Sequence, residues 1–491
     1  MNKGKKLGYA VISVALWLLL WQLLAERIHN AVFLPSPWQT AESLGRLAAS
    51  GELSGTIAGS LFNITKGFFL AAAAGSLLAV LSAASALLCS FFDLPVRVIK
   101  ATPVASFTIL ALLWMNSSEL SVLISFFMAL PVIYTNVLTG IRETDRKLLE
   151  MARVFEIPRL RRVRYLYLPS VLPFFLSACS VAIGLAWKSG IAAEVIGVVK
   201  NSIGNRLYQS KIYLEIPELF AWTLVTILVS VLFEQVVLWL VRCAKRLLIG
   251  TEKETERAVT EEPWEPRQDS GGRMEPEAKT KSAPRGVPAI SVNRMEKKYG
   301  DHVVLQKVSL LLQEGEHAAV MGSSGIGKTT LLRILLGIEQ EDGGSVTVNG
   351  TVAVVFQENR LCEETTVLQN LRMICRTGEQ RARIPEVLSA LGLADCRNRR
   401  AACLSGGMKR RVAIARALLA DGSILLLDEP FRGLDERTRL AVMEYTRSCA
   451  ENKTLLLITH DRQEAEFFGC RQAELFPTVT APETKSFQNF H

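Results

Sequence analysis

Hydrophobic residues are distributed unevenly along the chain and divide it into two parts. Before residue 250 they form long, nearly uninterrupted runs, whereas in the second half short apolar runs alternate with polar segments. A run of about 20 apolar residues can cross a bilayer as a helix. Short buried runs followed by helical periodicity favour strands joined by helices. The pattern therefore predicts an α-helical membrane domain followed by an α/β domain.

The first part contains six apolar runs, and we expect about six transmembrane helices. The first run follows three lysines, so a cleaved signal peptide is the alternative interpretation, but its length of about 19 residues favours a retained helix. The third run is short, and its ends are not defined by the pattern. The runs are Leu7–Ala25, Ile57–Ala84, Thr102–Met115, Leu120–Thr139, Val171–Val199 and Pro217–Val241.

Basic residues gather in two segments that set the expected orientation. Residues 141–170 hold eight arginines and lysines, and residues 242–246 follow the last run with three more. Cytoplasmic loops carry such an excess. With six spans, a cytoplasmic N-terminus places both segments and the second domain in the cytoplasm. We predict a multi-pass protein of the cell (plasma or inner) membrane, embedded in the lipid bilayer. The net charge of +9 then reflects topology, and we expect no nucleic-acid partner.

A polar segment separates the two parts. Residues 251–287 are rich in Glu, Lys, Arg, Pro, Ser and Gly and lack apolar periodicity, which is typical of a flexible tether. We expect a membrane domain at 1–250, a charged linker at 251–287 and a second domain at 288–491. The nine cysteines include no C-x-x-C pair and no Cys/His cluster, which argues against a zinc site or a disulfide scaffold.

The second domain opens with a phosphate-binding pattern. Residues 322–329 follow the short apolar run 318–321 and precede an apolar helical pattern. In such a strand–loop–helix unit, glycines let successive N–H groups point inward at an anion, and the helix N-terminus adds its positive end. Lys328 can reach the β- and γ-phosphates, and the Thr329 hydroxyl can bind Mg²⁺. The residues expected to bind ATP here are Gly322, Ser323, Ser324, Gly325, Gly327, Lys328, Thr329 and Thr330.

Five further motifs follow the phosphate-binding loop in a fixed order. Together they resemble the Q-loop, signature, Walker B, D-loop and switch histidine of ABC ATPases. The resemblance implies an α/β P-loop ATPase domain that hydrolyses ATP. The motifs are Phe356-Gln357, Leu404-Ser405-Gly406-Gly407-Met408, Ile424 to Glu429, Gly433-Leu434-Asp435 and Thr459-His460-Asp461.

The resemblance assigns a role to each catalytic residue. Glu429 would be the base for the attacking water, and His460 would orient or polarise near the γ-phosphate. Thr329, Gln357 and Asp428 would hold Mg²⁺. Tyr299 would stack on the adenine of ATP.

The signature motif implies a partner subunit. In this family the signature of one ATPase domain closes on the P-loop of another, so a single ATPase domain per chain implies a homodimer. Ser405, Gly406 and Gly407 would then contact the partner's ATP. Asp435 is the expected D-loop residue. Met408 replaces the usual glutamine and cannot offer its polar contact.

The basic segment also resembles a known motif. From Glu150 to Pro169 its spacing is that of the Glu-Ala-Ala loop of ABC importer permeases, and we expect Glu150, Ala152, Glu156 and Pro158 to form a loop that couples the ATPase to the membrane helices. Met151 replaces an alanine and Glu156 replaces a glycine that breaks the loop into two helices. We expect Pro158 to supply that break instead.

The wider membrane domain, roughly residues 30–242, is similar to the nitrate/sulfonate/taurine branch of these permeases. Pro131, residues 140–142 and residues 186–194 carry the likeness, together with residues 60–68. It implies a type I importer-like fold and ATP-driven import of a small solute, a nitrate-, sulfonate- or taurine-like anion, delivered by a separate extracytoplasmic substrate-binding protein. The alternatives are import of a vitamin precursor such as a thiamine pyrimidine, an ABC exporter, and a sensor.

Two ionisable residues lie within the fifth apolar run. Lys188 and Glu194 are costly in such a span and usually have partners. They lie six residues apart, well off one helix face, and cannot pair well with each other. Both interpretations stay open: positions in the transport pathway, or contacts between helices that fix their packing.

Overall fold

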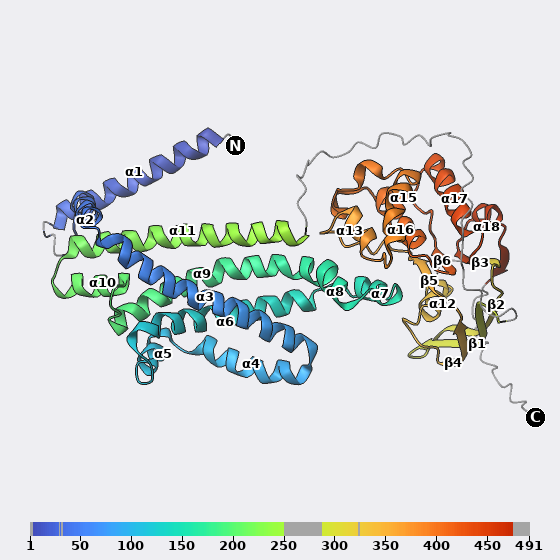
Figure 1. The fold of residues 1–491 in the computed structure, drawn as a ribbon, viewed down its shortest axis with the longest axis horizontal. Helices are drawn as coiled ribbons and strands as arrows, with labels where there is room; N and C mark the ends of the chain where they lie inside the picture. Colours follow the sequence, from blue (N-terminus) through green and yellow to red (C-terminus); the bar gives the residue numbers. More distant parts are fainter. Residues whose placement is uncertain (1–2, 29, 31–32, 250–286, 323–324, 475–491) are drawn as a thin grey trace, which may run out of the picture. The chain divides into compact units, whose positions relative to one another are not determined.

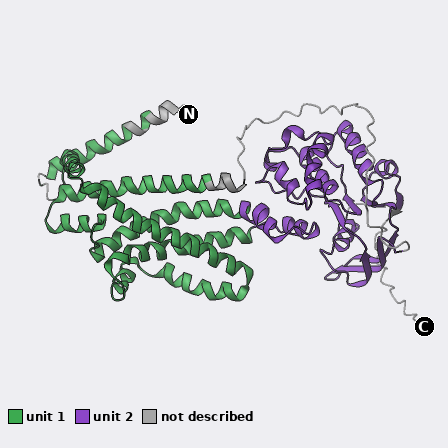
Figure 2. Ribbon diagram, in the orientation of Figure 1, with its two compact units in different colours: residues 1–143, 170–250 green, residues 144–169, 251–491 purple. Residues whose placement is uncertain are grey.

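The computed structural model describes residues 3–28, 30, 33–249, 287–322 and 325–474 (Figure 1). The chain divides into two compact units: Met1–Glu143 with Ser170–Gly250, and Thr144–Pro169 with Thr251–His491 (Figure 2). The segment Thr144–Pro169, which carries the importer-like motif, therefore belongs to the second unit. The predicted linker, 251–287, lies outside the described residues apart from Val287.

The first unit is built of helices. Four stretches are long and apolar enough to cross a membrane: α3, α6, the stretch Arg159–Gly197 that ends with α9, and Ile216–Cys243 within α11. They match four of the expected spans, and α1 covers the first expected run. The helices of this unit are α1 (Lys3–Ile28), α2 (Pro37–Ala49), α3 (Glu52–Ala84), α4 (Ala86–Ala101), α5 (Val104–Ala111), α6 (Ser117–Arg142), α9 (Leu168–Gly197), α10 (Ile203–Ile212) and α11 (Ile216–Ile249).

The expected span Thr102–Met115 is wrong as a single helix. The helix in this region, α5, has eight residues, and it reaches membrane-spanning length only together with α4, from which it is bent by 102°. Pro103 causes the bend, because it disfavours the helical conformation at Thr102, which is extended with φ −77° and ψ 127°. The apolar pattern missed α4 because Asp93, Arg97 and Lys100 interrupt its apolar residues.

Close approach of α3 and α6 organises the core of the first unit. The two helices lie side by side (Figure 1). A Cβ atom at Gly67 would lie 2.4 Å from the Val122 carbonyl oxygen, so only glycine permits this contact. Ile64 and Phe68 on α3 and Tyr134 on α6 are fully buried.

Glu194 joins three helices inside the first unit. Its side chain is fully buried, and its Oε2 accepts hydrogen bonds from Ser60 Oγ on α3 (2.7 Å) and from the Gly204 N–H on α10 (3.2 Å). Ser60 Oγ in turn accepts from the Ile203 N–H at 2.8 Å. Lys188 is exposed and takes no part. Glu194 thus makes the contact between helices that one of the two sequence interpretations expects.

The second unit contains two sheets, as the pattern of short apolar runs predicts. An antiparallel sheet has the order β2-β1-β4, and a parallel sheet has the order β5-β6-β7-β3-β8. Strands β6 and β7 are buried along their whole length, as is usual for parallel strands covered on both faces. The strands are β1 (Ile290–Tyr299), β2 (His302–Leu312), β3 (His317–Met321), β4 (Gly343–Val348), β5 (Val352–Val355), β6 (Ile424–Asp428), β7 (Thr454–Ile458) and β8 (Arg471–Glu474).

Helices of the second unit connect these strands and include the importer-like loop. That loop forms α7 and α8, which a five-residue π turn, Val163–Tyr167, joins to α9. The helices are α7 (Arg146–Val154), α8 (Arg159–Arg162), α12 (Lys328–Leu335), α13 (Val367–Arg372), α14 (Gly378–Ala382), α15 (Ile384–Ala390), α16 (Gly406–Leu419), α17 (Glu436–Ala450) and α18 (Arg462–Phe467). Because β3, β6 and β7 are parallel neighbours, the loops that follow them lie at one edge of the sheet, where α/β folds place ligands.

Candidate active site

The phosphate-binding loop joins β3 to α12. Gly325 and Gly327 have positive φ angles of 85° and 99°, and a Cβ atom at Gly327 would lie 2.6 Å from Leu305 Cδ2. Only glycine fits there. Lys328 is buried, and its ammonium group donates a hydrogen bond to the Gly322 carbonyl. The loop therefore has the glycine conformations and the buried lysine that phosphate binding requires.

The other predicted P-loop residues differ in accessibility. Thr329 is exposed and Thr330 is half-buried at the start of α12. Ser323 and Ser324 lie outside the described residues. Tyr299, at the end of β1, is 49% exposed, and its hydroxyl donates to the Glu339 carboxylate. Lys297 Nζ lies over its ring, 5.6 Å from the centroid.

Asp428 ends β6 with its carboxylate buried. Burial raises the pKa of Asp428 to about 6, and the neighbouring Glu429 charge acts in the same direction. Its Oδ2 is buried and has no hydrogen-bond partner within the part of the chain that the structure describes. A buried carboxylate oxygen without a donor suits a cation, and Mg²⁺ is bound through carboxylate oxygens. Asp428, with the exposed side chains of Thr329 and Gln357, therefore fits the group that the sequence implies.

Glu429 and His460, the two predicted catalytic residues, are brought together. His460 Nδ1 lies 3.6 Å from Glu429 Oε1, and Arg432 Nη1 lies 3.0 Å from Glu429 Oε2. Glu429 has a φ of 44°, and its N–H donates to the Ile458 carbonyl at 2.8 Å. A left-handed conformation costs a non-glycine residue about 1–2 kcal/mol. The backbone at this strand end therefore fixes the direction of the carboxylate.

Arg410 positions the catalytic loop, and the sequence interpretation assigned it no role. It lies on α16 with 4% of its surface exposed. Its guanidinium donates to the carbonyls of Asp428 (2.6 Å), Glu429 (2.5 Å), Pro430 (2.8 Å) and Phe356 (2.6 Å). Burial lowers its pKa to about 10, while the charges of Asp428 and Glu429 oppose that shift. The signal available in the sequence was the position of this arginine, two residues after the signature motif.

The signature residues lie at the start of α16. Ser405 caps the helix, and its Oγ accepts from the Met408 N–H at 3.3 Å. Gly406 is exposed, with nothing within 4 Å of the position of a Cβ atom. Within the described residues Ser405 has no hydrogen bond to the phosphate-binding loop. Met408 is buried in the hydrophobic core, so its side chain points away from the exposed face of the motif.

Asp435, the predicted D-loop residue, caps α17. The Thr438 N–H donates to Asp435 Oδ2 at 3.0 Å, and this hydrogen bond to the backbone holds the pKa of Asp435 below its ordinary value. The carboxylate is therefore charged at neutral pH and fixes the turn between Glu429 and α17.

Glu150 connects the importer-like loop to two parts of the ATPase site. Its Oε1 lies 3.1 Å from Arg333 Nη2 on α12, the helix that begins at the phosphate-binding loop. Its Oε2 lies 3.0 Å from Arg360 Nη1, three residues after Gln357. Ala152 and Met151 are fully buried in the hydrophobic core of the second unit. The loop thus contacts the helix that follows the phosphate-binding loop and the segment that follows Gln357.

The break between α7 and α8 differs from the expectation. It is made at Glu156, whose φ of 48° is left-handed, rather than by Pro158 alone. The Ile157 N–H donates to the Ala152 carbonyl at 2.9 Å, which closes the end of α7. Pro158 then precedes α8 as its N-cap. Glu156 therefore adopts a glycine-like conformation, and its carboxylate pairs with Arg376 Nη2 at 2.8 Å.

Both halves of the chain match known families. Residues 305–432 match the ABC transporter family, and residues 55–248 match the binding-protein-dependent transport system inner membrane component family. One relative, "Aliphatic sulfonates import ATP-binding protein SsuB 2" of Pseudomonas syringae pv. tomato, is 44% identical over 185 residues, which cover 37% of this chain and 79% of the relative.

Further relatives carry the same name. The SsuB 1 protein of Pseudomonas savastanoi pv. phaseolicola is 42% identical over 38% of this chain and 80% of its own length. SsuB of Corynebacterium glutamicum is 41% identical over 36% of this chain and 76% of its own length. A solved dimeric ATP-binding cassette with ADP and Pi is 30% identical, with a TM-score of 0.35, and the match covers 38% of this chain and 94% of the cassette. This chain therefore belongs to the ABC transporter family, as a multi-pass membrane protein that joins a binding-protein-dependent permease domain and an ATP-hydrolysing domain in one polypeptide.

Proposed function

We propose that this chain imports a sulfonate-like organic anion into the cytoplasm, using ATP hydrolysis at a dimeric site. The observation that carries this proposal is the double ion pair of Glu150, because it connects an importer-type loop to α12 and to the segment after Gln357. An importer needs such a connection to turn nucleotide binding into helix movement. The relatives' names give the class of solute.

The hydrolytic step follows from the residues at the strand ends. Lys328 and the glycine-rich loop bind the phosphates of ATP. Mg²⁺ held by Thr329, Gln357 and Asp428 would neutralise phosphate charge when bound. Glu429 takes a proton from water, the water oxygen attacks the γ-phosphorus, and the bond from that phosphorus to ADP breaks. His460, 3.6 Å from Glu429 Oε1, orients that carboxylate.

A second copy of the chain completes each site in this proposal. Ser405, Gly406 and Gly407 lie at the N-terminus of α16, and the exposure of Gly406 leaves its backbone accessible to a phosphate on the partner subunit. The two copies would then be related by a two-fold axis. ATP favours the closed dimer, and hydrolysis removes that preference, so the membrane helices alternate between two states.

The proposed importer receives its solute from a substrate-binding protein outside the membrane. In this arrangement the N-terminus and the ATPase domain are cytoplasmic, as the basic residues of 141–170 indicate. In this proposal the substrate-binding protein contributes much of the selectivity.

Uptake into proteoliposomes tests this function. The full chain is reconstituted with ATP inside the vesicles, and a candidate binding protein is added outside with labelled ethanesulfonate, taurine, nitrate or a thiamine pyrimidine. We expect ATP-dependent uptake of the sulfonates that is lost in Glu429→Gln and kept in Glu444→Gln, an exposed glutamate of α17. Uptake of the thiamine pyrimidine, without uptake of the sulfonates, would show that the solute is a vitamin precursor. ATP-dependent movement in the opposite direction, without a binding protein, would identify an exporter.

A further inference from the structure

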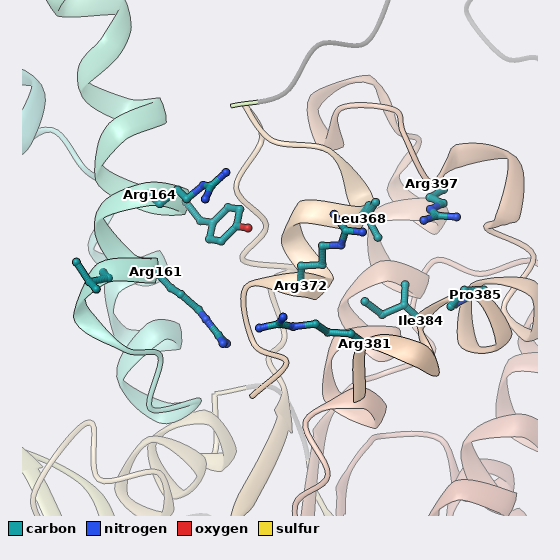
Figure 3. A pocket seen from close by; sticks show the side chains of 10 residues that line it. Arg161, Arg164, Leu368, Arg372, Arg381, Ile384, Pro385 and Arg397 are labelled. Carbon is teal, nitrogen blue, oxygen red and sulfur yellow. The ribbon is translucent and has the colours of Figure 1, made fainter. Parts of the chain in front are cut away.

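A cavity of about 550 Å³ lies within the second unit, between the importer-like loop and helices α13–α15 (Figure 3). Five of its ten lining residues are arginines: Arg161, Arg164, Arg372, Arg381 and Arg397. Leucine, isoleucine, proline and tyrosine side chains form the rest of the wall. Of the described residues, no aspartate or glutamate lines it.

The arginines approach from both walls. Arg161 comes from α8 and Arg381 from α14, and Figure 3 shows their side chains pointing toward one another across the cavity, with Arg372 beside them. The charges also converge on Cys375, whose thiol is buried. Burial raises the pKa of Cys375 to about 11, against the opposing charges of Arg381, Arg161 and Arg372. The guanidinium groups therefore create one common positive field.

These arginines lack the partners that arginines elsewhere in this unit have. Arg333, Arg360, Arg376, Arg432, Arg439 and Arg471 each lie within 4.0 Å of a carboxylate. Within the described residues, Arg372, Arg381 and Arg397 form no ion pair through their side chains. Arg164 lies over the Tyr165 ring at 5.8 Å, and Arg161 Nη1 donates to the Cys375 carbonyl at 2.5 Å. Like charges so placed repel one another, and an anion that neutralised several of them would be favoured.

The chemistry of the wall defines the anion. A guanidinium donates two parallel hydrogen bonds to phosphate or carboxylate oxygens. A singly charged solute such as a sulfonate would neutralise only one arginine, whereas a group with two or more phosphate charges matches the cluster. The volume is within the range of small-molecule sites, about 300–1,000 Å³. The apolar side chains, among them Leu368 and Ile384, add a surface for a non-phosphate part.

We propose that this cavity is an anion site for a phosphate-bearing polyanion, separate from the ATP site, that joins the importer-like loop to helices α13–α15. The polyanion is either a soluble phosphorylated molecule or the headgroup of a lipid with two phosphates. Binding bridges Arg161 of the loop to Arg372 and Arg381 of the ATPase helices, and so limits the movement of the loop. The proposal does not depend on which solute the transporter carries.

Binding of inorganic pyrophosphate to the full chain tests the soluble source. The protein is purified in detergent and saturated with a non-hydrolysable ATP analogue, so that the P-loop is occupied, and pyrophosphate is then titrated by calorimetry. The test variant is Arg372→Gln with Arg381→Gln. The matched control is Arg447→Gln, which removes an exposed arginine of α17 far along the chain from the cavity residues. We expect binding to weaken by at least about tenfold in the double variant and to be unchanged in the control.

Nanodiscs test the lipid source. Thermal stability is compared in phosphatidylcholine alone and with cardiolipin, which carries two phosphates. The lipid headgroup is the ligand if cardiolipin raises the melting temperature of the wild type and of Arg447→Gln but not that of the double variant, and if the wild type does not bind pyrophosphate. Equal behaviour of the wild type and the double variant in both assays, or binding by neither ligand, would overturn the proposal. The affinity for the ATP analogue checks folding, and Arg397→Gln replaces the double variant if that affinity falls.

Discussion

Glu150 Oε1 lies 3.1 Å from Arg333 Nη2, so a carboxylate of the importer-like loop contacts the helix that begins at the phosphate-binding loop. The same carboxylate reaches Arg360, 3.0 Å from its other oxygen. Both arginines are largely buried, with side-chain exposures of 27% and 8%, so these ion pairs are better shielded from solvent than surface pairs are. Glu150 thus connects the importer-like loop to α12 and to the segment that follows Gln357.

We predict that Glu150→Gln uncouples transport from hydrolysis. The amide cannot accept both charge-assisted hydrogen bonds, so α12 and the Arg360 segment move without the loop. Solute uptake should fall by at least about tenfold while ATP hydrolysis stays within about twofold of wild type. Proteoliposome uptake and phosphate release measure the two. Glu358→Gln is the control, because its pair with Lys147 is 54% exposed on both sides. Equal loss of both activities in Glu150→Gln would contradict a coupling role.

We predict that Glu429→Gln stops hydrolysis and keeps ATP binding. The amide retains the shape of the side chain but cannot take the proton of water, so phosphate release should fall by about 10²–10⁴-fold. Fluorescent ATP binding should be unchanged, since Lys328 and the glycines are intact. Turnover near the wild-type rate would show that another group is the base.

We predict that Arg410→Met destabilises the ATPase domain by at least about 3 kcal/mol, because the variant leaves several buried carbonyls without a donor. Among these carbonyls are those of Asp428, at the end of β6, and of Phe356. Chemical denaturation measures the change. Lys409→Met on the same helix is the control, since Lys409 pairs with a glutamate that is 62% exposed. A loss no larger than that of the control would rule out a structural role for Arg410.

We predict that replacing Glu156 has opposite effects for glycine and alanine. Glycine removes the strain of the left-handed conformation and should stabilise the second unit by up to about 1 kcal/mol. Alanine keeps that strain and also loses the Arg376 pair, so it should destabilise slightly. The exposed pair, 49% and 72% accessible, contributes little by itself. Thermal unfolding compares the two variants, and a stabilising alanine would refute the conformational explanation.

Glu464 makes stability depend on pH. Its carboxylate is buried, and this burial raises its pKa above the ordinary value of 4.5, although the Thr459 hydroxyl donates to it at 2.6 Å. The folded protein therefore holds this proton more tightly than the unfolded chain does, so Glu464 lowers stability as pH rises above about 4.5. We predict that Glu464→Gln has a higher melting temperature than wild type at pH 8 and that the difference disappears near pH 4. An equal difference at both pH values would show that ionisation of Glu464 is not the cause.

Local patterns predicted the features that depend on neighbouring residues in the sequence. The apolar run before Asp428 identified a buried strand, and the spacing of 322–329 identified the turn before α12. Features that depend on distant contacts were missed. Arg410 has a role only because Phe356 and Asp428 meet in the fold, and the basic cavity exists only because α8 packs against α13–α15.

The bend at Thr102–Pro103 shows the limit of hydropathy. The apolar run that begins at Thr102 predicts one spanning helix, but the helix in that run, α5, has only eight residues and is bent by 102° from α4, which the pattern did not identify. Glu156 shows a different limit, since a glutamate gives no sign that its backbone is left-handed.

The hydrogen bonds of Glu194 have a mechanical consequence for transport. Ser60, Glu194 and the Ile203–Gly204 backbone tie α3, α9 and the start of α10 together. Sliding or rotating one of these helices against the others would leave a carboxylate and backbone N–H groups unsatisfied in an apolar interior. The parts of α3, α9 and α10 around these hydrogen bonds should therefore move as one rigid body. The hinges of any change between outward-facing and inward-facing states then lie elsewhere in the domain.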